Sequence, residues 1–235
     1  MQTPATTERL LVFARPPILG RVKRRLAAQL GDRLALRLYR AFLVDTLALA
    51  HRAAADGRSV EICFGSAWQP DAAIGAALGS LPTTPQGEGD LGQRLLRAFS
   101  QSRRRGERSC VVIGTDSPTL PDTTVQQAFR RLADGSPATL APASDGGYVL
   151  LGLAGGTPPR LETFFSGIPW GTSDVARRTL EQASAAGQSV AMLVEGFDVD
   201  DLDGLTRLRQ ELADPDIAAR APATYALLRD LDLGT

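Results

Sequence analysis

The segment SCVVIGTD, residues 109–116, joins β-branched residues to an abrupt polar end at Asp116, and Pro118 stiffens the loop that follows. This pattern predicts a buried strand that ends near the aspartate. A carboxylate held rigidly at such a strand end could ligate a hard cation such as Mg²⁺ through oxygen. It could equally cap the next turn by accepting hydrogen bonds from backbone amides, and the residues alone leave both roles open.

A second segment, FARPPILGRVKRRL at residues 13–26, gathers cations directly after another predicted strand. Its charged and flexible positions are Arg15, Gly20, Arg21, Lys23, Arg24 and Arg25. Phosphate groups commonly bind in such a first strand-to-helix connection. The spacing matches neither G-x-G-x-x-G nor the P-loop. Lys23 is the only lysine among 26 basic residues, and its compact ammonium suits phosphate oxygens. A solvated, basic helix start is the alternative.

The turn GFDVDDLD, residues 196–203, concentrates acids beyond a late predicted strand. Its aspartates are Asp198, Asp200, Asp201 and Asp203. Four like charges in one turn are costly unless a cation or a helix N-terminus offsets them. Helix capping accounts for one or two of these acids, so the turn is a candidate cation site.

Two glycine-rich segments and a tryptophan could face a ligand. In APASDGGYVLLGL, residues 141–153, the glycines after Asp145 allow close backbone approach and Tyr148 offers a ring and a hydroxyl, although a hairpin turn explains the pattern as well. In residues 84–94, Gln86 could read a base edge, or the glycines could only start a helix. Trp170 is a candidate for lining an acceptor pocket, whereas packing explains Trp68 better.

The elements that must position these residues follow an alternating strand–helix pattern, which predicts a mostly parallel α/β sheet. Ligands bind such sheets at the carboxyl ends of the strands. The predicted strands cover residues 9–14, 59–65, 81–85, 109–116 and 189–194; the predicted helices cover 32–54, 71–78, 89–105, 121–134, 173–187 and 201–213. From about residue 136 the strand–helix alternation gives way to glycine- and proline-rich segments, which suggests a less regular lobe on the sheet.

Composition narrows the classes of partner. The 26 basic residues balance 26 acidic ones, without the excess that nucleic-acid binding needs. Cys63 and Cys110 lie in apolar runs, as expected of buried free thiols in a reducing cytoplasm. No segment is apolar for long enough to span a membrane. A single histidine, His51, excludes a histidine-dependent triad and a multi-histidine metal centre. We therefore expect a cytoplasmic protein with small-molecule partners.

Together these segments resemble a family over nearly the whole chain. FARPPILGRVKRRLA is similar to that family's opening F-A-(K/R)-x-P-x-x-G-x-x-K-T-R-L-A, and GTDSPTL, PASDGGYVLLGL, GIPWGTSDV and the DVD turn follow in its order. The family comprises bacterial arsenosugar-biosynthesis-type glycosyltransferase-like proteins, associated with radical-SAM proteins. It is related to the nucleotide-diphospho-sugar transferase (GT-A) fold and, more distantly, to molybdenum-cofactor and phospholactate nucleotidyltransferases.

The resemblance implies a single domain over residues 1–235 with a Rossmann-like, mixed but mostly parallel central sheet flanked by helices and a small irregular acceptor-side lobe. It implies catalytic roles for Asp116, Lys23 and Asp145, and a Mg²⁺ or Mn²⁺ ion held by Asp116 and Asp200. The implied nucleotide-binding residues are Ala14, Arg15, Gly20, Lys23, Arg25, Gln86, Asp90 and Gly92. The implied acceptor-binding residues are Gly146, Gly147, Tyr148 and Trp170. Two positions depart from the family: Arg24 and Asp201 each replace a hydroxyl residue.

The function implied is a metal-dependent transfer from a nucleotide-activated donor to a small-molecule acceptor, with no nucleic-acid partner. A nucleotide-sugar glycosyltransferase is preferred because the family resemblance points that way. A nucleotidyltransferase acting on a small phosphorylated acceptor needs the same metal and the same cations and stays the alternative. A catalytically silent nucleotide-binding protein is a third possibility, motivated by Arg24.

Overall fold

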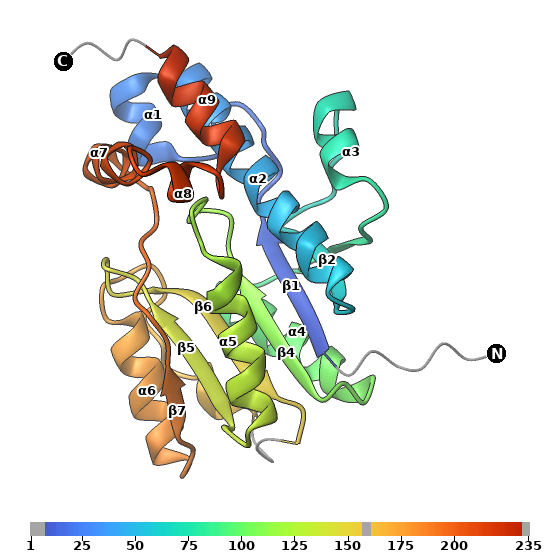
Figure 1. The fold of residues 1–235 in the computed structure, drawn as a ribbon. Coiled ribbons are helices and arrows are strands. Elements are labelled where there is room, and N and C mark those ends of the chain that lie inside the picture. Colours follow the sequence, from blue (N-terminus) through green and yellow to red (C-terminus); the bar gives the residue numbers. More distant parts are fainter. Residues whose placement is uncertain (1–7, 157–160, 232–235) are drawn as a thin grey trace.

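Seven strands form one sheet in the order β3-β2-β1-β4-β6-β5-β7 (Figure 1). The computed structural model describes residues 8–156 and 161–231. Strand β6 runs antiparallel to its neighbours β4 and β5, whereas the other neighbouring strands are parallel. The predicted fold class, a mixed and mostly parallel sheet flanked by helices, is confirmed.

The strands are β1 (Glu8–Ala14), β2 (Ser59–Phe64), β3 (Thr83–Pro85), β4 (Ser109–Ile113), β5 (Ala138–Pro142), β6 (Tyr148–Ala154) and β7 (Val190–Met192). The helices are α1 (Arg24–Leu30), α2 (Asp32–Ala55), α3 (Ala72–Leu78), α4 (Leu91–Arg104), α5 (Asp122–Ala133), the short 3₁₀ helix η1 (Leu161–Phe164), α6 (Val175–Ala185), α7 (Leu202–Glu211), α8 (Pro215–Ala218) and α9 (Pro222–Asp230).

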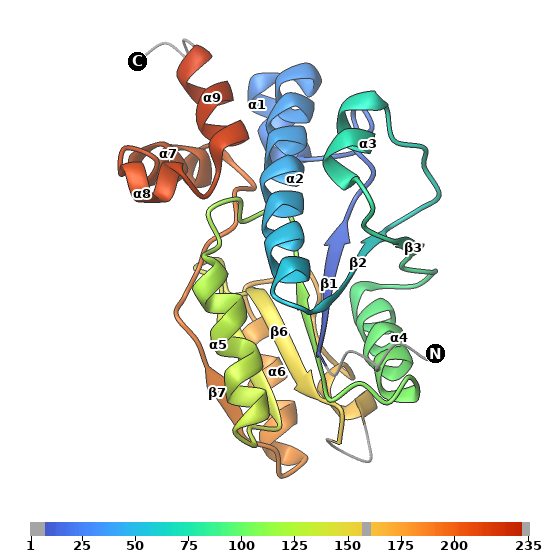
Figure 2. The same ribbon diagram turned by 45° about the vertical axis from the view of Figure 1, so that its right-hand side comes forward.

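Helices cover both faces of the sheet because successive strand residues point to opposite sides. In β1, Leu10 and Val12 pack toward α2, α3 and α5, whereas Leu11 packs with Leu95 and Phe99 of α4 and with residues of η1 and α6. The two faces are visible in Figure 2, with α2 and α5 on one side and α4 on the other. Strands buried on both faces read as continuous apolar runs, which explains the character of residues 109–113.

A third apolar cluster lies beyond the carboxyl ends of the strands. It joins Leu26 of α1 and Phe42 of α2 to Phe197 and Val199 of the acidic turn, and it extends to Leu208 of α7 and the C-terminal helix α9. Figures 1 and 2 both show α1, α7 and α9 gathered at this end of the sheet. The cluster therefore packs α1 and α2 against the acidic turn and the C-terminal helices at the edge where ligands usually bind.

The predicted elements before residue 135 and after residue 173 are present, with ends shifted by a few residues. The irregular part is smaller than the sequence suggested, because residues 138–142 and 148–154 form a hairpin inside the central sheet. Between this hairpin and α6, the described irregular residues are 165–174, which follow η1. The two strands were not predicted, because the glycines of the turn between them indicated an irregular segment. Helices α1, α8 and α9 were not predicted, since each is short and lacks a long apolar period.

The residues expected to be structural pack as predicted. Cys63 and Cys110 are buried free thiols, and burial raises the pKa of Cys63 to about 11. His51 Nε2 lies 2.9 Å from the carbonyl oxygen of Ala77. The Trp68 ring lies 5.3 Å from that of Phe64. In the part of the chain that the structure describes, no helix combines the length and apolarity needed to cross a bilayer.

Asp45 anchors the C-terminal helix to α2. Its carboxylate, 2% exposed, accepts hydrogen bonds from the backbone amides of Ala223 and Thr224 at 2.9 and 2.8 Å. We predict that Asp45→Ala lowers the free energy of unfolding by about 1–3 kcal/mol, because buried amides would lose their acceptor. Chemical denaturation measures this. The control is Asp214→Ala, which removes the exposed cap of α8 and should cost less; equal losses would contradict the prediction.

Candidate active site

A cleft of about 380 Å³ opens at the carboxyl ends of the strands. Nine of the residues singled out from the sequence for site roles line it together: Arg15, Lys23, Arg25, Asp116, Asp145, Gly147, Tyr148, Trp170 and Asp200. They come from five separate segments of the chain. The cationic loop after β1 and the late acidic turn therefore share one cavity with the end of β4.

Lys23 joins the two candidate metal ligands. Its Nζ lies 2.5 Å from Asp116 Oδ1 and 2.9 Å from Asp200 Oδ1. The lysine side chain is 2% exposed, while each carboxylate is 44% exposed, so the ammonium lies beneath the carboxylates and they face the cleft. Burial alone would lower the pKa of Lys23, but the charges of Asp116 and Asp200 outweigh it and hold the pKa above its usual value.

The backbone of Lys23 explains the inward direction of its side chain. Lys23 is the N-cap of α1 and has φ 47° and ψ 49°, the left-handed region that a residue other than glycine adopts at an energetic cost. Its Nζ also lies 5.6 Å from the centroid of the Phe42 ring. Packing against the third apolar cluster offsets the unfavourable backbone and holds the ammonium in place.

Tyr39 of α2 holds two of the cleft loops together. Its hydroxyl accepts a hydrogen bond from the backbone amide of Arg15 at 2.7 Å and donates one to the carbonyl of the same residue at 2.8 Å. The hydroxyl of Thr115 lies 3.2 Å from it, one residue before Asp116. Sequence analysis missed Tyr39, and a hydroxyl on the apolar face of a long helix was the signal that could have found it.

The acidic turn is attached directly to the loop after β4. The backbone amide of Val199 donates to the carbonyl of Asp116 at 2.9 Å, which places Asp200 beside Asp116. The next residue, Asp201, caps α7 by accepting from the amide of Gly204 at 3.0 Å. The turn therefore divides its acids between a structural cap and the cleft.

Asp198 belongs to the same acidic turn, which was predicted as a candidate cation site without an individual role for this residue. Partial burial, followed by the charges of Asp145, Asp200 and Asp116, raises the pKa of Asp198 to about 6. The carboxylates of Asp116, Asp145 and Asp200 are therefore close enough to Asp198 for their negative charges to interact. A cation bound between these carboxylates would reduce their repulsion.

Cations also line the cleft. Arg15, Arg24 and Arg25 are exposed and line the cavity. None of these guanidinium groups forms a side-chain hydrogen bond or an ion pair with residues 8–156 or 161–231, whereas Arg9, Arg58 and Arg177 each pair with an acidic side chain. Three unpaired guanidinium groups around one cavity are suited to an anion with several charged oxygens.

The β5–β6 hairpin and the irregular segment form the remaining wall. Asp145 Oδ1 accepts from the amide of Gly147 at 2.8 Å, which orients the carboxylate toward the cleft. Gly146 has φ +89°, and a Cβ there would overlap the carbonyl of Ser173, so only glycine fits. The Tyr148 hydroxyl is buried without a hydrogen-bond partner among the described residues; only the remainder of its ring can border a ligand.

The other sequence-predicted residues do not line the cleft. Asp90 caps α4 in a reciprocal capping box with Gln93. Gly20 lies in the turn of the cationic loop with φ +72°, and Ala14 is buried at the end of β1. Gly92 lies behind Trp170, where a Cβ would come within 2.6 Å of the indole Nε1. The predicted segment around the start of α4 thus contributes Leu91 to the cleft, although no individual role was predicted for this residue.

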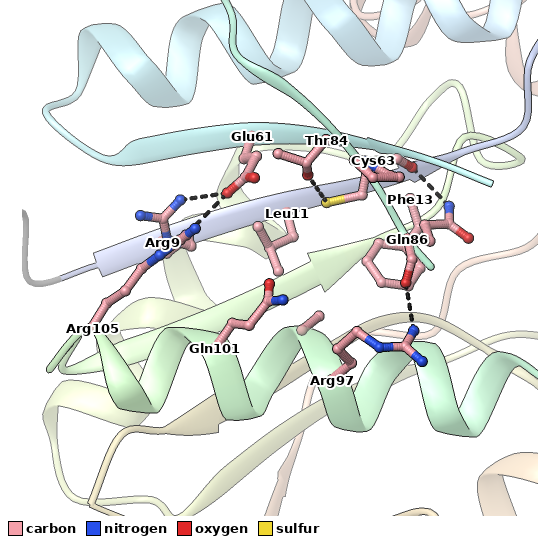
Figure 3. Close-up of a pocket in the computed structure, with 12 residues that line it drawn as sticks. Arg9, Leu11, Phe13, Glu61, Cys63, Thr84, Gln86, Arg97, Gln101 and Arg105 are labelled. Carbon is pink, nitrogen blue, oxygen red and sulfur yellow. Dashed lines mark hydrogen bonds and ion pairs between the residues drawn. The ribbon is translucent and has the colours of Figure 1, made fainter. Parts of the chain in front are cut away.

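Gln86 lies at a second, smaller pocket between β1–β3 and α4, where its side chain is bound within the protein (Figure 3). Its amide nitrogen donates to the carbonyls of Cys63 at 2.7 Å and Ala14 at 3.2 Å, and its Oε1 accepts from Arg94. No polar atom is left to read a base edge. The pocket measures about 20 Å³, room for about one water molecule, so it is too small for a nucleotide.

The family of the chain follows from sequence comparison. Residues 46–172 match the model of the family described as "Uncharacterized protein conserved in bacteria (DUF2064)", and the chain belongs to this family. The matched region includes Asp116 and Asp145 and lies between Lys23 and Asp200. A search of curated proteins found no match.

Solved structures place the fold among nucleotide-dependent transferases. A Desulfovibrio desulfuricans G20 protein provisionally assigned as a nucleotide-diphospho-sugar transferase is 31% identical, with a TM-score of 0.86 and coverage of 97% of this chain and 96% of its own. A cytidylyltransferase from Leptospira borgpetersenii is 12% identical, with a TM-score of 0.55 over 98% of this chain and 100% of its own. A nucleotidyl transferase from Methanothermobacter thermautotroptrophicus is 15% identical, with a TM-score of 0.56 over 88% and 98%.

The last two similarities establish the fold alone. The first, at 31% identity over nearly both chains, supports membership of the nucleotide-diphospho-sugar transferase superfamily. The transferase class predicted from the sequence agrees with all three assignments.

Gly92 controls the position of Trp170. We predict that Gly92→Ala displaces the indole, because the new methyl group would overlap it, and that the fluorescence emission of Trp170 shifts. The measurement uses a Trp68→Phe background, since the chain has two tryptophans. Gly75→Ala in α3, where a Cβ meets nothing within 4 Å, is the control. Identical spectra for both variants would contradict this packing.

Proposed function

We propose that the protein is a metal-dependent transferase that uses a nucleotide-activated donor, with a nucleotide-sugar as the preferred donor class. The observation that carries the proposal is the shared cleft, which is lined both by the Asp116–Asp200 pair at the strand ends and by guanidinium groups that have no partner among the described residues. The 31%-identical relative, itself assigned among nucleotide-diphospho-sugar transferases, supports the same class of donor.

The two aspartates fit a divalent ion of the Mg²⁺ or Mn²⁺ type. No group of three or more acidic, histidine or cysteine side chains in the described part of the chain forms a closed metal site. Two carboxylates are nevertheless what Mg²⁺ uses when substrate phosphates and water supply its other ligands. When bound, the ion would polarise the phosphate oxygens and stabilise negative charge on the leaving group.

The residues of the chain then have separate tasks. Arg15, Arg24 and Arg25 bind the phosphate oxygens and spread their charge. Trp170 and the ring of Tyr148 border the acceptor. Asp145, oriented by Gly147, accepts the proton of the acceptor hydroxyl. The oxygen of that hydroxyl attacks the anomeric carbon of the donor sugar. The bond from the anomeric carbon to the diphosphate breaks, and the nucleoside diphosphate leaves.

A nucleotidyltransferase is the second candidate, and Arg24 favours it. The sequence resemblance places threonine at this position, whereas Arg24 adds a third unpaired guanidinium group to the cleft. An additional cation suits the higher charge of a nucleoside triphosphate. In that reaction the acceptor attacks the α-phosphorus and pyrophosphate leaves.

We extend the proposal to the subfamily, the cellular location and the partners of the protein. An arsenosugar-type subfamily, a cytoplasmic location and the absence of a nucleic-acid partner agree with the motifs, the buried free thiols and the balanced charge. A single domain over residues 1–235 agrees with the continuous sheet.

We predict that the wild-type protein binds nucleoside di- or triphosphates only with Mg²⁺ or Mn²⁺, and that Asp116→Asn weakens this binding at least about tenfold by removing a charged ligand. Titration calorimetry with and without chelator measures both effects. The matched control is Asp122→Asn, because Asp122 pairs with Arg52 on the surface away from the cleft. Equally tight wild-type binding in chelator would disprove the metal requirement.

Product analysis separates the candidate reactions. A glycosyltransferase releases nucleoside diphosphate from a nucleotide-sugar, whereas a nucleotidyltransferase releases pyrophosphate from a nucleoside triphosphate. We expect the first product in a panel of donors and hydroxyl acceptors, and its loss in Asp145→Asn. Pyrophosphate would favour the alternative, and binding without turnover of any donor would favour a silent nucleotide-binding protein.

A further inference from the structure

The ammonium of Lys23 interacts with the same two side chains that the proposed function assigns to the divalent ion. Both contacts are made to Oδ1 atoms, at 2.5 Å for Asp116 and 2.9 Å for Asp200. The second oxygen of each carboxylate makes no hydrogen bond or ion pair to the described residues, and the carboxylates are 44% exposed to the cleft. A metal ion that binds from the cleft would therefore contact two carboxylates that already form ion pairs with Lys23 on their buried side.

Charge determines what that metal ion would experience. Two carboxylates carry two negative charges, and Lys23 neutralises one of them at hydrogen-bonding distance. Because the ammonium is buried, solvent screens it only weakly, and it repels a second cation. The pair alone is thus a poor site for a free divalent ion. A bound nucleotide adds phosphate charges that Arg15, Arg24 and Arg25 can hold beside the pair.

We propose that Lys23 is a resident counter-ion of the Asp116–Asp200 pair, and that it makes divalent-metal binding depend on the nucleotide. This inference rests on the proposed function, since it concerns the same cleft. The metal enters as a complex with the nucleotide phosphates, and in the protein without nucleotide Lys23 offsets one of the two carboxylate charges. Lys23 is a positioning residue: it orients the two carboxylates and sets their net charge.

The geometry distinguishes this role from the phosphate contact predicted from the sequence. The left-handed backbone turns the side chain inward, the Phe42 ring borders it, and two of its three donors are used by aspartates. A lysine that binds phosphate would instead direct its ammonium group into the cavity, as the exposed arginines direct their guanidinium groups. The two roles give opposite changes when the charge is removed.

The test measures Mn²⁺ binding without nucleotide by calorimetry. We expect Lys23→Met, which keeps an unbranched side chain of similar length and loses the charge, to bind Mn²⁺ at least about tenfold more tightly than wild type, because the carboxylate pair then needs the metal as its counter-ion. The increase in Mn²⁺ affinity on adding nucleotide should be smaller in this variant than in wild type, and by reciprocity so should the increase in nucleotide affinity on adding Mn²⁺. The control is Arg24→Met, which removes a neighbouring charge from the cleft and should weaken nucleotide binding instead.

A second variant tests whether the result depends on misfolding of Lys23→Met. Lys23→Asn is neutral and tolerates the left-handed backbone, so it should reproduce the gain in Mn²⁺ affinity. The wild-type protein supplies a measurement without any variant: its Mn²⁺ affinity should rise at least about a hundredfold when nucleotide is present.

Unchanged or weaker Mn²⁺ binding in folded Lys23 variants would overturn the counter-ion role, as would equal wild-type affinities with and without nucleotide. Failure of the proposed function has a different signature, because a wild-type protein that binds no nucleotide in the presence of metal rejects the transferase cleft itself.

Discussion

The arrangement of the cleft depends on one ion-pair triad, the buried ammonium of Lys23 between the carboxylates of Asp116 and Asp200. Its members are separated by most of the chain, and two like charges would not otherwise stay together. The cost of burying the cation is offset because both partners are charged and hydrogen-bonded to it. The same contact that organises the pair also limits the negative charge it can offer a metal ion.

The third apolar cluster makes this triad possible. Leu26 follows Lys23 in the chain, and Val199 precedes Asp200, so packing the two apolar residues together carries the charged ones into contact. Helix α9 closes this cluster through the buried carboxylate of Asp45. The C-terminal helices, which show no catalytic motif, therefore support the cleft by holding the two cleft-forming segments against each other.

Polar side chains in this protein divide sharply between structure and function. Gln86 and Asp90 have the residue types of ligand contacts, yet every polar group of Gln86 is used inside the protein and Asp90 caps a helix. The side chains of Arg15, Arg24 and Arg25 have no such partners within residues 8–156 and 161–231. The difference lies in whether a neighbouring backbone group comes within hydrogen-bonding distance, and neighbours distant in sequence decide that.

The sequence alone determined the strand–helix order, the position of the acids at strand ends and the cationic first loop, because periodicity, β-branching and turn residues act over a few neighbours. It also placed Asp116, Lys23 and Asp200 among the candidate site residues. Only the tertiary structure decided that residues 138–154 complete the sheet, that Tyr39 fastens two loops, and that Lys23 lies beneath the carboxylates. These outcomes depend on packing between segments far apart in the chain, which no local pattern encodes.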